Sequence, residues 1–250
     1  MYKKTLNTHF VGQTRLDLPT CRSTNDFLKE MLEQGLVQNG QLVITTHQTD
    51  GRGQRASTWQ SEPNKNLTFS IGLFDIELPS EQQFQLNIIT SLAVIKTINE
   101  NTKANAQIKW PNDIYIDNKK VAGILIEQKI KKETIDQAVI GLGLNINQQQ
   151  FDLPHASSLA NAIGGELDLE DFLTQFLQNF EHFLFRKEDF DGLKELYYQN
   201  LMRYQVPALY RKDDVLFAAI ILGINQNGQL ILQEETQTSC YNIKEISFEL

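Results

Sequence analysis

Residues 108–146 read IKWPNDIYIDNKKVAGILIEQKIKKETIDQAVIGLGLNI, and this stretch decides the fold class. It predicts three strands: Ile108 to Tyr115 with an interruption at Pro111, Val121 to Lys129, and Ile135 to Ile146. Asp117 and Asn118 are turn residues, so we expect the first two strands to form a hairpin. Because neighbouring strands follow one another without strict βαβ alternation, the pattern indicates an α+β domain.

The residues before this stretch predict one helix and two strands. Ser23 with Asp26 resembles a capping box, and the apolar spacing that follows predicts a helix from near Ser23 to near Gly35. A strand is expected at residues 42–46, followed by a polar loop from Thr49 to Asn66. The strict alternation of Leu67, Phe69, Ile71 and Leu73 predicts a half-buried strand.

Three further helices are predicted to flank the sheet. Ser80 and Gln83 are expected to cap a long amphipathic helix that continues to Ile98 and covers one face. Apolar positions from Leu169 to Phe183 and from Leu193 to Leu201 have helical spacing. The sheet is therefore expected to be mixed, mostly antiparallel, and flanked by helices.

From about Tyr204 the chain changes to short strands without helices. We expect them at Val206 to Tyr210, Val215 to Ile224, Leu230 to Leu232 and Cys240 to Ile246, with a turn at Asn227-Gly228. The apolar run from Val215 to Leu222 is interpreted as a buried strand. We therefore divide the chain into a main domain, residues 1–203, and a small C-terminal β-barrel, residues 204–250.

The composition limits the class of protein and partner. The 250 residues are 41% hydrophobic and 22% charged, which is typical of a globular protein. A net charge of −8 would repel a phosphate backbone, so nucleic acid is not expected as a partner. Neither a signal peptide nor a membrane span is predicted. Cys21 and Cys240 lie far apart, which indicates a reducing compartment and hence the cytoplasm, and the four histidines form no metal-binding cluster.

The segment from Gln48 to Trp59, QTDGRGQRASTW, is the first candidate for chemistry. Its glycines permit positive φ and a close backbone approach to a ligand. Arg52 and Arg55 suit the oxygens of a carboxylate or phosphate. The alternative is a solvated surface loop, which this short motif does not exclude.

Three later segments are further candidates. Lys109-Trp110-Pro111-Asn112-Asp113 places a proline in a strand, which suits an edge or a bulge, so its polar side chains could project into a pocket or remain solvated. Lys120 enters an apolar strand in which Gly123 removes a side chain, and it is either a functional cation or an ordinary turn lysine. Asn145 could bind a ligand or satisfy nearby backbone.

Taken together and in this order, these segments resemble the biotin protein ligases. The matching motifs are Ser23-Thr24-Asn25, Gly51-Arg52-Gly53 through Trp59, Lys109 to Asp113, Lys120 to Glu127, and Gly141 to Asn147. The resemblance spans residues 20–150, and the tail with Lys244-Glu245-Ile246-Ser247 is similar to the family's SH3-like barrel. It implies a class II synthetase-like ligase domain. Only 22 residues precede Ser23, so it also implies the monofunctional type without an N-terminal DNA-binding domain.

The resemblance implies an activity and a set of site residues. Such a ligase joins biotin to ATP as biotinyl-5'-AMP, with Mg²⁺ expected, and passes biotin to a lysine in the biotin carrier domain of a carboxylase. Lys120 and Arg52 would be the catalytic cations, and Asp113 would steer or deprotonate the acceptor lysine. The implied biotin-binding residues are Ser23, Thr24, Asn25, Gln48, Gly51, Arg52, Gly53, Gln54, Lys120 and Gly123, and the implied ATP-binding residues are Arg55, Trp59, Lys109, Asn112 and Asn145.

The sequence departs from the family pattern inside the loop. Gln54, Ala56 and Ser57 stand where the family commonly has arginine or glycine, which predicts a weaker hold on the adenylate. The alternatives are a lipoate or octanoate ligase, which would share the fold, and a biotin sensor without catalysis. Exposed sheet edges could pair two subunits or receive the carrier domain, so both a monomer and a homodimer are compatible with the sequence.

Overall fold

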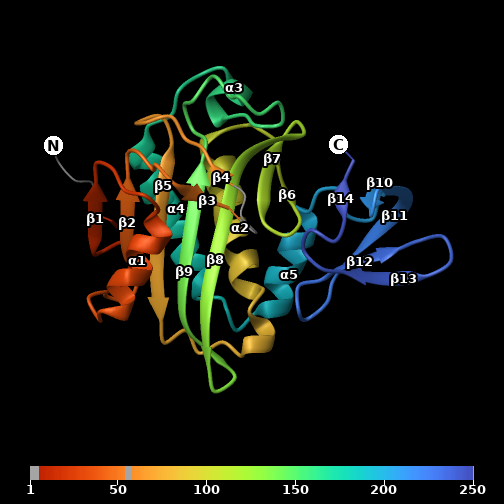
Figure 1. Cartoon of the computed structure of the whole chain (residues 1–250), viewed down its shortest axis with the longest axis horizontal. Coiled ribbons are helices and arrows are strands. Elements are labelled where there is room, and N and C mark those ends of the chain that lie inside the picture. The colour runs from red at the N-terminus through yellow and green to blue at the C-terminus, as the bar shows by residue number, and fades with distance from the viewer. Residues whose placement is uncertain (1–5, 54–57, 250) are drawn as a thin grey trace.

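The computed structural model describes residues 6–53 and 58–249, and a seven-stranded sheet forms its centre (Figure 1). Strand β1 pairs parallel to β2, and every other pairing in this sheet is antiparallel. The predicted mixed, mostly antiparallel α+β architecture is therefore confirmed. In spatial order the strands are β1 (Arg15–Leu18), β2 (Gln41–Thr45), β5 (Leu67–Phe74), β9 (Thr134–Leu144), β8 (Lys119–Lys131), β7 (Asp113–Ile116) and β6 (Ala106–Lys109).

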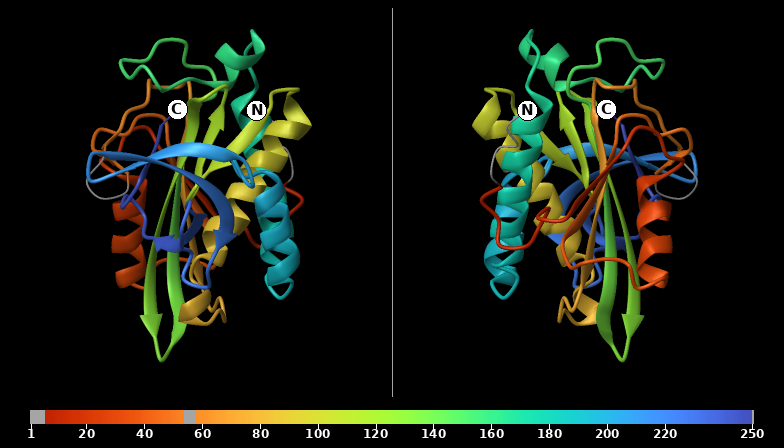
Figure 2. Two further views of the ribbon diagram at one scale, coloured as in Figure 1. Left: turned by 90° about the vertical axis from the view of Figure 1, so that its right-hand side faces the viewer. Right: turned by 90° about the vertical axis from the view of Figure 1, so that its left-hand side faces the viewer.

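Helices cover both faces of this sheet (Figure 2). Helix α1 (Thr24–Glu33) packs its Leu28 on one face, against Val43 and Val139. The opposite face carries α2 (Gln85–Asn101), α4 (Leu169–Leu184) and α5 (Phe190–Gln199), which belong to the main core. Because β5 lies between two strands and two helical layers, seven of its eight residues are buried, and the prediction of a half-buried strand is wrong.

Helix α2 differs from the prediction in its start and in its burial. Ser80 does not cap it, because Ser80–Gln82 form the short 3-10 helix η2 and α2 begins only at Gln85. Twelve of its 17 residues are buried, because α4 and α5 pack on the side that faces away from the sheet. A helix enclosed between two layers has no solvated stripe, so the predicted amphipathic pattern is absent.

The predicted interrupted strand around Pro111 is a tight hairpin. Strands β6 and β7 pair antiparallel with Lys109 opposite Asp113, and the cis Trp110–Pro111 peptide lies in the turn. The turn satisfies the requirement that proline avoid the ladder of a central strand. It also places the two charged side chains of the motif next to each other at the edge of the sheet.

A five-stranded antiparallel sheet forms the small C-terminal β unit, in the order β13-β12-β11-β10-β14. Its core is continuous with the main core, and Trp110 Nε1 donates to the Gly228 carbonyl at 3.0 Å. The strand predicted to reach Ile246 ends at Tyr241, and Val215–Leu222 is not a buried strand, because Val215 and Leu216 are 65% and 47% exposed. The strands are β10 (Pro207–Lys212), β11 (Val215–Ile224), β12 (Leu230–Gln233), β13 (Thr238–Tyr241) and β14 (Ser247–Phe248).

Three short elements complete the fold. Strands β3 (Gly51–Arg52) and β4 (Thr58–Trp59) form a small two-stranded sheet inside the segment predicted to be loop, and α3 (Leu159–Ile163) follows β9. Across the described parts of the chain, none of the helices has the length and apolar character needed to cross a membrane.

Candidate active site

Most of the predicted site residues line one cavity of about 410 Å³. The cavity lies between the first turn of α1, the β3–β4 segment, strands β8 and β9, the β6–β7 turn and the C-terminal strand, and its size is that of a typical small-molecule site. The predicted residues in its wall are Ser23, Thr24, Asn25, Gln48, Arg52, Gly53, Trp59, Lys109, Asn112, Asp113, Lys120 and Gly123.

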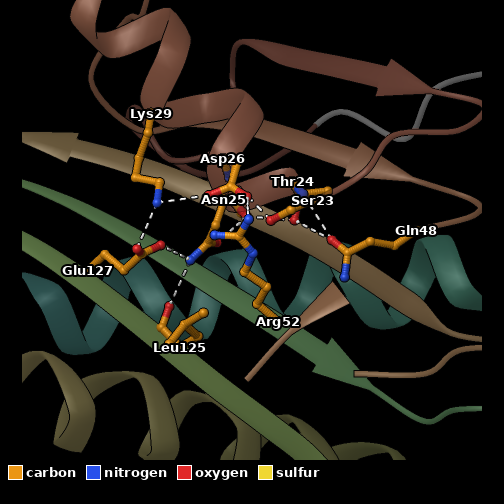
Figure 3. Close-up of polar contacts among 10 residues, drawn as sticks. Ser23, Thr24, Asn25, Asp26, Lys29, Gln48, Arg52, Leu125 and Glu127 are labelled. Atoms are coloured by element: carbon orange, nitrogen blue, oxygen red, sulfur yellow. Dashed lines mark hydrogen bonds and ion pairs between the residues drawn. The ribbon is translucent and has the colours of Figure 1, made fainter. Parts of the chain in front are cut away.

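The start of α1 supplies the polar floor of the cavity (Figure 3). Ser23 caps the helix by accepting from the Asp26 backbone N–H at 3.3 Å, as the sequence predicts. The cap turns Ser23 and the two residues after it inward, where each is less than 5% exposed. Gln48, from the segment after β2, accepts from the Thr24 backbone N–H at 2.9 Å. This hydrogen bond holds the segment after β2 against the start of α1.

Asn25 is held by residues that sequence reasoning missed. Its Nδ2 donates to Glu127 Oε2 at 2.9 Å and to the Leu125 carbonyl at 3.3 Å, while its Oδ1 accepts from the Ser70 hydroxyl at 2.6 Å. A Cβ on Gly141 would lie 2.2 Å from Asn25 Oδ1, so this glycine is required for the asparagine to fit. The only sequence signals were a serine within apolar β5 and a glycine within apolar β9.

Trp59 lies across two glycines of the central sheet. Gly123 and Gly143 are paired between β8 and β9, and a Cβ on Gly143 would come within 2.1 Å of the indole Cε2. The side chain missing at Gly123 therefore makes room for Trp59 and Lys120, both 3.2 Å from its hypothetical Cβ. Among the described atoms, the buried indole N–H has no hydrogen-bond partner, which leaves it as a donor beside the cavity.

Arg52 and Lys120 share the cavity, as the interpretation of the sequence required. Arg52 pairs with Asp26 at 3.3 Å, and Lys120 pairs with Asp113 at 2.7 Å. The Lys120 ammonium also lies 6.0 Å from the centre of the Trp59 ring. Two cations from distant parts of the chain thus face one cavity, and each one is paired with a carboxylate.

Lys109 lies in a less polar part of the wall. Its ammonium is 3.4 Å from the Tyr115 hydroxyl and 5.4 Å from the centre of the Phe248 ring. Burial lowers the pKa of Lys109 below the ordinary lysine value, and burial raises the pKa of Tyr115 to about 12. Sequence reasoning assigned no site residue to the C-terminal unit, yet Ile243, Lys244, Ile246, Ser247 and Phe248 complete this wall.

Several predicted site residues have other surroundings. Asn112 lines the cavity, but its Nδ2 donates to Asn87 Oδ1 at 2.5 Å and so ties the β6–β7 turn to α2. Asn145 and Gly51 are not part of the described cavity wall: Asn145 donates to the Ser157 carbonyl at 3.0 Å, and Gly51 packs against the Trp59 carbonyl. Gly51 does not adopt the positive φ that the sequence suggested. The need for glycine at this position is instead explained by the close packing against Trp59. The predicted contacts of Gln54 and Arg55, and the effects of Ala56 and Ser57, lie outside the described residues.

Comparisons with known proteins concern the family and the fold of this chain. Residues 18–145 match the model of the biotin/lipoate A/B protein ligase family. The chain is 29% identical over 252 residues to the bifunctional ligase/repressor BirA of Bacillus spizizenii, covering 98% of this chain and 76% of that protein. It is 26% identical to biotin–protein ligase 2 of Arabidopsis thaliana, covering 92% and 73%. Its fold superposes on the biotin protein ligase of Aquifex aeolicus, solved in complex with biotin and ATP, with a TM-score of 0.79, 25% identity, and 95% and 99% coverage.

Proposed function

Because this chain belongs to the biotin/lipoate A/B protein ligase family, we propose that it is an ATP-dependent ligase for biotin. It activates biotin with ATP as biotinyl-5'-AMP and transfers biotin to a lysine of a biotin carrier protein. The relatives from Arabidopsis thaliana and Aquifex aeolicus are biotin protein ligases, and the structure of the latter holds both biotin and ATP. The observation that carries the proposal is the single cavity in which Arg52 and Lys120 face the polar floor of α1.

The first half-reaction needs fixed cations. A biotin carboxylate must attack the α-phosphate of ATP, and two anions repel each other unless positive charge lies between them. Arg52 and Lys120 supply this charge by exchanging their present carboxylate partners for the ligand oxygens. Both ion pairs are partly exposed, and such pairs contribute at most about 1 kcal/mol. The exchange therefore costs little.

The polar floor and Trp59 suit the two parts of the adenylate. Ser23, Thr24, Asn25 and Gln48 offer short donors and acceptors to the ureido ring of biotin. Trp59 offers an aromatic face and a free N–H on the side where we place the nucleotide. Lys109 extends the positive charge toward the phosphates.

The second half-reaction requires a neutral acceptor amine. A free lysine has a pKa of about 10.4, so at neutral pH its amine is almost fully protonated. We assign Asp113 to steering or deprotonating this lysine, because it lies at the cavity rim next to Lys120. The carboxylate can accept the proton only after Lys120 has turned to the adenylate. This order of events couples transfer to prior activation.

We infer that Mg²⁺ accompanies the ATP phosphates. Within residues 6–53 and 58–249 no group of three or more histidine, cysteine, aspartate or glutamate side chains gathers to hold a metal. Mg²⁺ usually keeps several waters and is bound through substrate phosphates with one or two carboxylates. The described residues fit a metal held mainly by the triphosphate. Its role would be to neutralise the charge of the leaving pyrophosphate.

Exchange of radiolabelled pyrophosphate into ATP tests the activity directly. We expect exchange that depends on biotin and that lipoate or octanoate does not replace. Labelling of a purified carrier domain then tests the transfer, and we propose that the natural acceptor is the carrier domain of a biotin-dependent carboxylase in the cytoplasm. Binding of biotin without exchange would favour a sensor, and exchange with lipoate alone would favour the lipoate class.

A further inference from the structure

The side-chain amide of Asn25 is restricted to one orientation (Figure 3). Its Nδ2 faces the Glu127 carboxylate at 2.9 Å and the Leu125 carbonyl at 3.3 Å. Both of these groups can only accept hydrogen bonds, so the atom that faces them must be the nitrogen. If the amide were reversed, its oxygen would face two groups that cannot donate, and the Glu127 carboxylate and the Leu125 carbonyl would both lose the hydrogen bond from Asn25.

This orientation decides what Asn25 can offer to a ligand. Both of its N–H groups are already used, while Oδ1 accepts, among the described residues, only from the Ser70 hydroxyl. An amide oxygen has two lone pairs, so one acceptor position remains. Asn25 lines the cavity, and therefore it can recognise an N–H group there but cannot donate to a carbonyl.

Glu127 is itself held by a second charged residue. Lys29, one turn after Asn25 on α1, places its ammonium 2.7 Å from Glu127 Oε1 and 2.9 Å from Asp26 Oδ1. Each carboxylate oxygen of Glu127 thus has its own partner, Lys29 on one side and Asn25 on the other. Two partners in fixed positions prevent rotation of the carboxylate. The contacts therefore run from the partly exposed Lys29 through Glu127 to Asn25 at the cavity floor.

We propose that Glu127 is a positioning residue for substrate recognition. It does not belong to the described cavity wall, and it acts by keeping the Asn25 oxygen directed at an N–H group of the ligand ring. This inference rests on the proposed function, since biotin carries ureido N–H groups at the end that we place on the α1 floor. Recognition at this end then depends on a residue from β8 that the ligand never touches.

A glutamine at position 127 would remove the constraint without removing the shape. Its single oxygen can accept from Lys29 or from Asn25 but not from both. When the oxygen turns to Lys29, the new NH₂ group faces Asn25 and favours the reversed amide. The reversed Asn25 presents donors to the ring N–H group, which weakens binding.

The chain contains a matched control. Glu100 on α2 accepts from Asn179 Nδ2 at 2.8 Å and pairs with Lys96, so it has the same two kinds of partner as Glu127. Its partner Asn179 lies outside the described cavity wall, whereas Asn25, the partner of Glu127, lines the cavity. Glu127→Gln and Glu100→Gln therefore lose the same contacts at different places. Calorimetric titration with biotin, kinetics of biotin-dependent pyrophosphate exchange, and thermal unfolding are measured for both.

We expect Glu127→Gln to raise both the Kd and the KM for biotin about tenfold, with kcat and the KM for ATP unchanged. Glu100→Gln should match the wild type in all four. In an Asn25→Ala background, Glu127→Gln should have no further effect on biotin binding, because the partner through which it acts is gone. Lys29→Met, which loosens Glu127 from the outside, should raise the KM for biotin about threefold and provides a second measurement if Glu127→Gln does not fold.

Three results would overturn the positioning role: a wild-type Kd for biotin in Glu127→Gln, an equal loss in Glu100→Gln, or a loss that persists in the Asn25→Ala background. Each of these results is meaningful only when the wild-type protein, measured alongside, binds biotin and catalyses exchange. If the wild-type protein does neither, the proposed function fails instead. The two failures are therefore distinguishable.

Discussion

The contact between Trp59 and Gly143 allows the arrangement of the site to be tested with a graded series of alanines. A new Cβ would lie 2.1 Å from the indole at Gly143, 3.2 Å at Gly123, and in open space at Gly165. Carbon atoms prefer separations of about 3.5–4.0 Å, so only the first substitution creates a clash that small shifts cannot relieve. Gly143→Ala must displace either Trp59 or strand β9.

The indole is the part that should move. Strand β9 is paired on both sides, whereas β4 pairs, within the part of the chain that the structure describes, only with the two residues of β3. Forcing an extra group into a packed core costs about 1–3 kcal/mol. Since the Trp59 side chain can move away from the central sheet instead, we expect Gly143→Ala to lower the free energy of unfolding by no more than about 1 kcal/mol. The adenylate site would lose its aromatic wall.

Acrylamide quenching and pyrophosphate exchange measure the two consequences. Trp110 is 4% exposed and serves as an internal reference, so increased quenching reports Trp59. We expect Gly143→Ala to slow adenylate formation about 10- to 100-fold, Gly123→Ala less than threefold, and Gly165→Ala not at all. Wild-type exchange and quenching in Gly143→Ala would refute the reasoning, as would an equal loss in Gly165→Ala.

Four further predictions concern single side chains. Lys120→Met should reduce biotin-dependent pyrophosphate exchange at least 100-fold. Lys119→Met, at the exposed neighbouring residue, should leave exchange unchanged, and equal losses in both variants would contradict the catalytic role of Lys120. Asp113→Asn should form adenylate normally but transfer biotin to a carrier domain about 100-fold more slowly in single-turnover assays. Lys109→Met should raise the melting temperature at pH 7, because burial disfavours the charged lysine and this cost is complete at a pH below its lowered pKa. The gain should shrink as the pH rises from that pKa and vanish above about 10.5, the ordinary lysine value. Glu181→Gln should cost about 1–3 kcal/mol in denaturant unfolding, because its buried carboxylate accepts from three backbone N–H groups near the N-terminus, and an unchanged midpoint would contradict this.

Much of the local structure could be predicted from the sequence because its signals are local. Ser23 as a cap, the Asp117-Asn118 turn, the apolar spacing of α4 and the position of strand β5, though not its burial, each depend on residues that are close together in the sequence. The ordered motifs likewise identified twelve residues that line the cavity. Local φ/ψ preferences and side-chain chemistry were sufficient for these predictions.

Only the tertiary structure decided which side chains complete the site and how they are held. Burial of β5 on both faces depends on two helical layers from distant parts of the chain, and the contact of Gly143 with Trp59 depends on strand register. The hydrogen bond between Asn25 and Glu127 and the contact between Lys109 and Phe248 each join residues more than 100 positions apart in the sequence. Such contacts follow from the packing of whole elements, whose free energy is shared among many residues and leaves no pattern in any one segment.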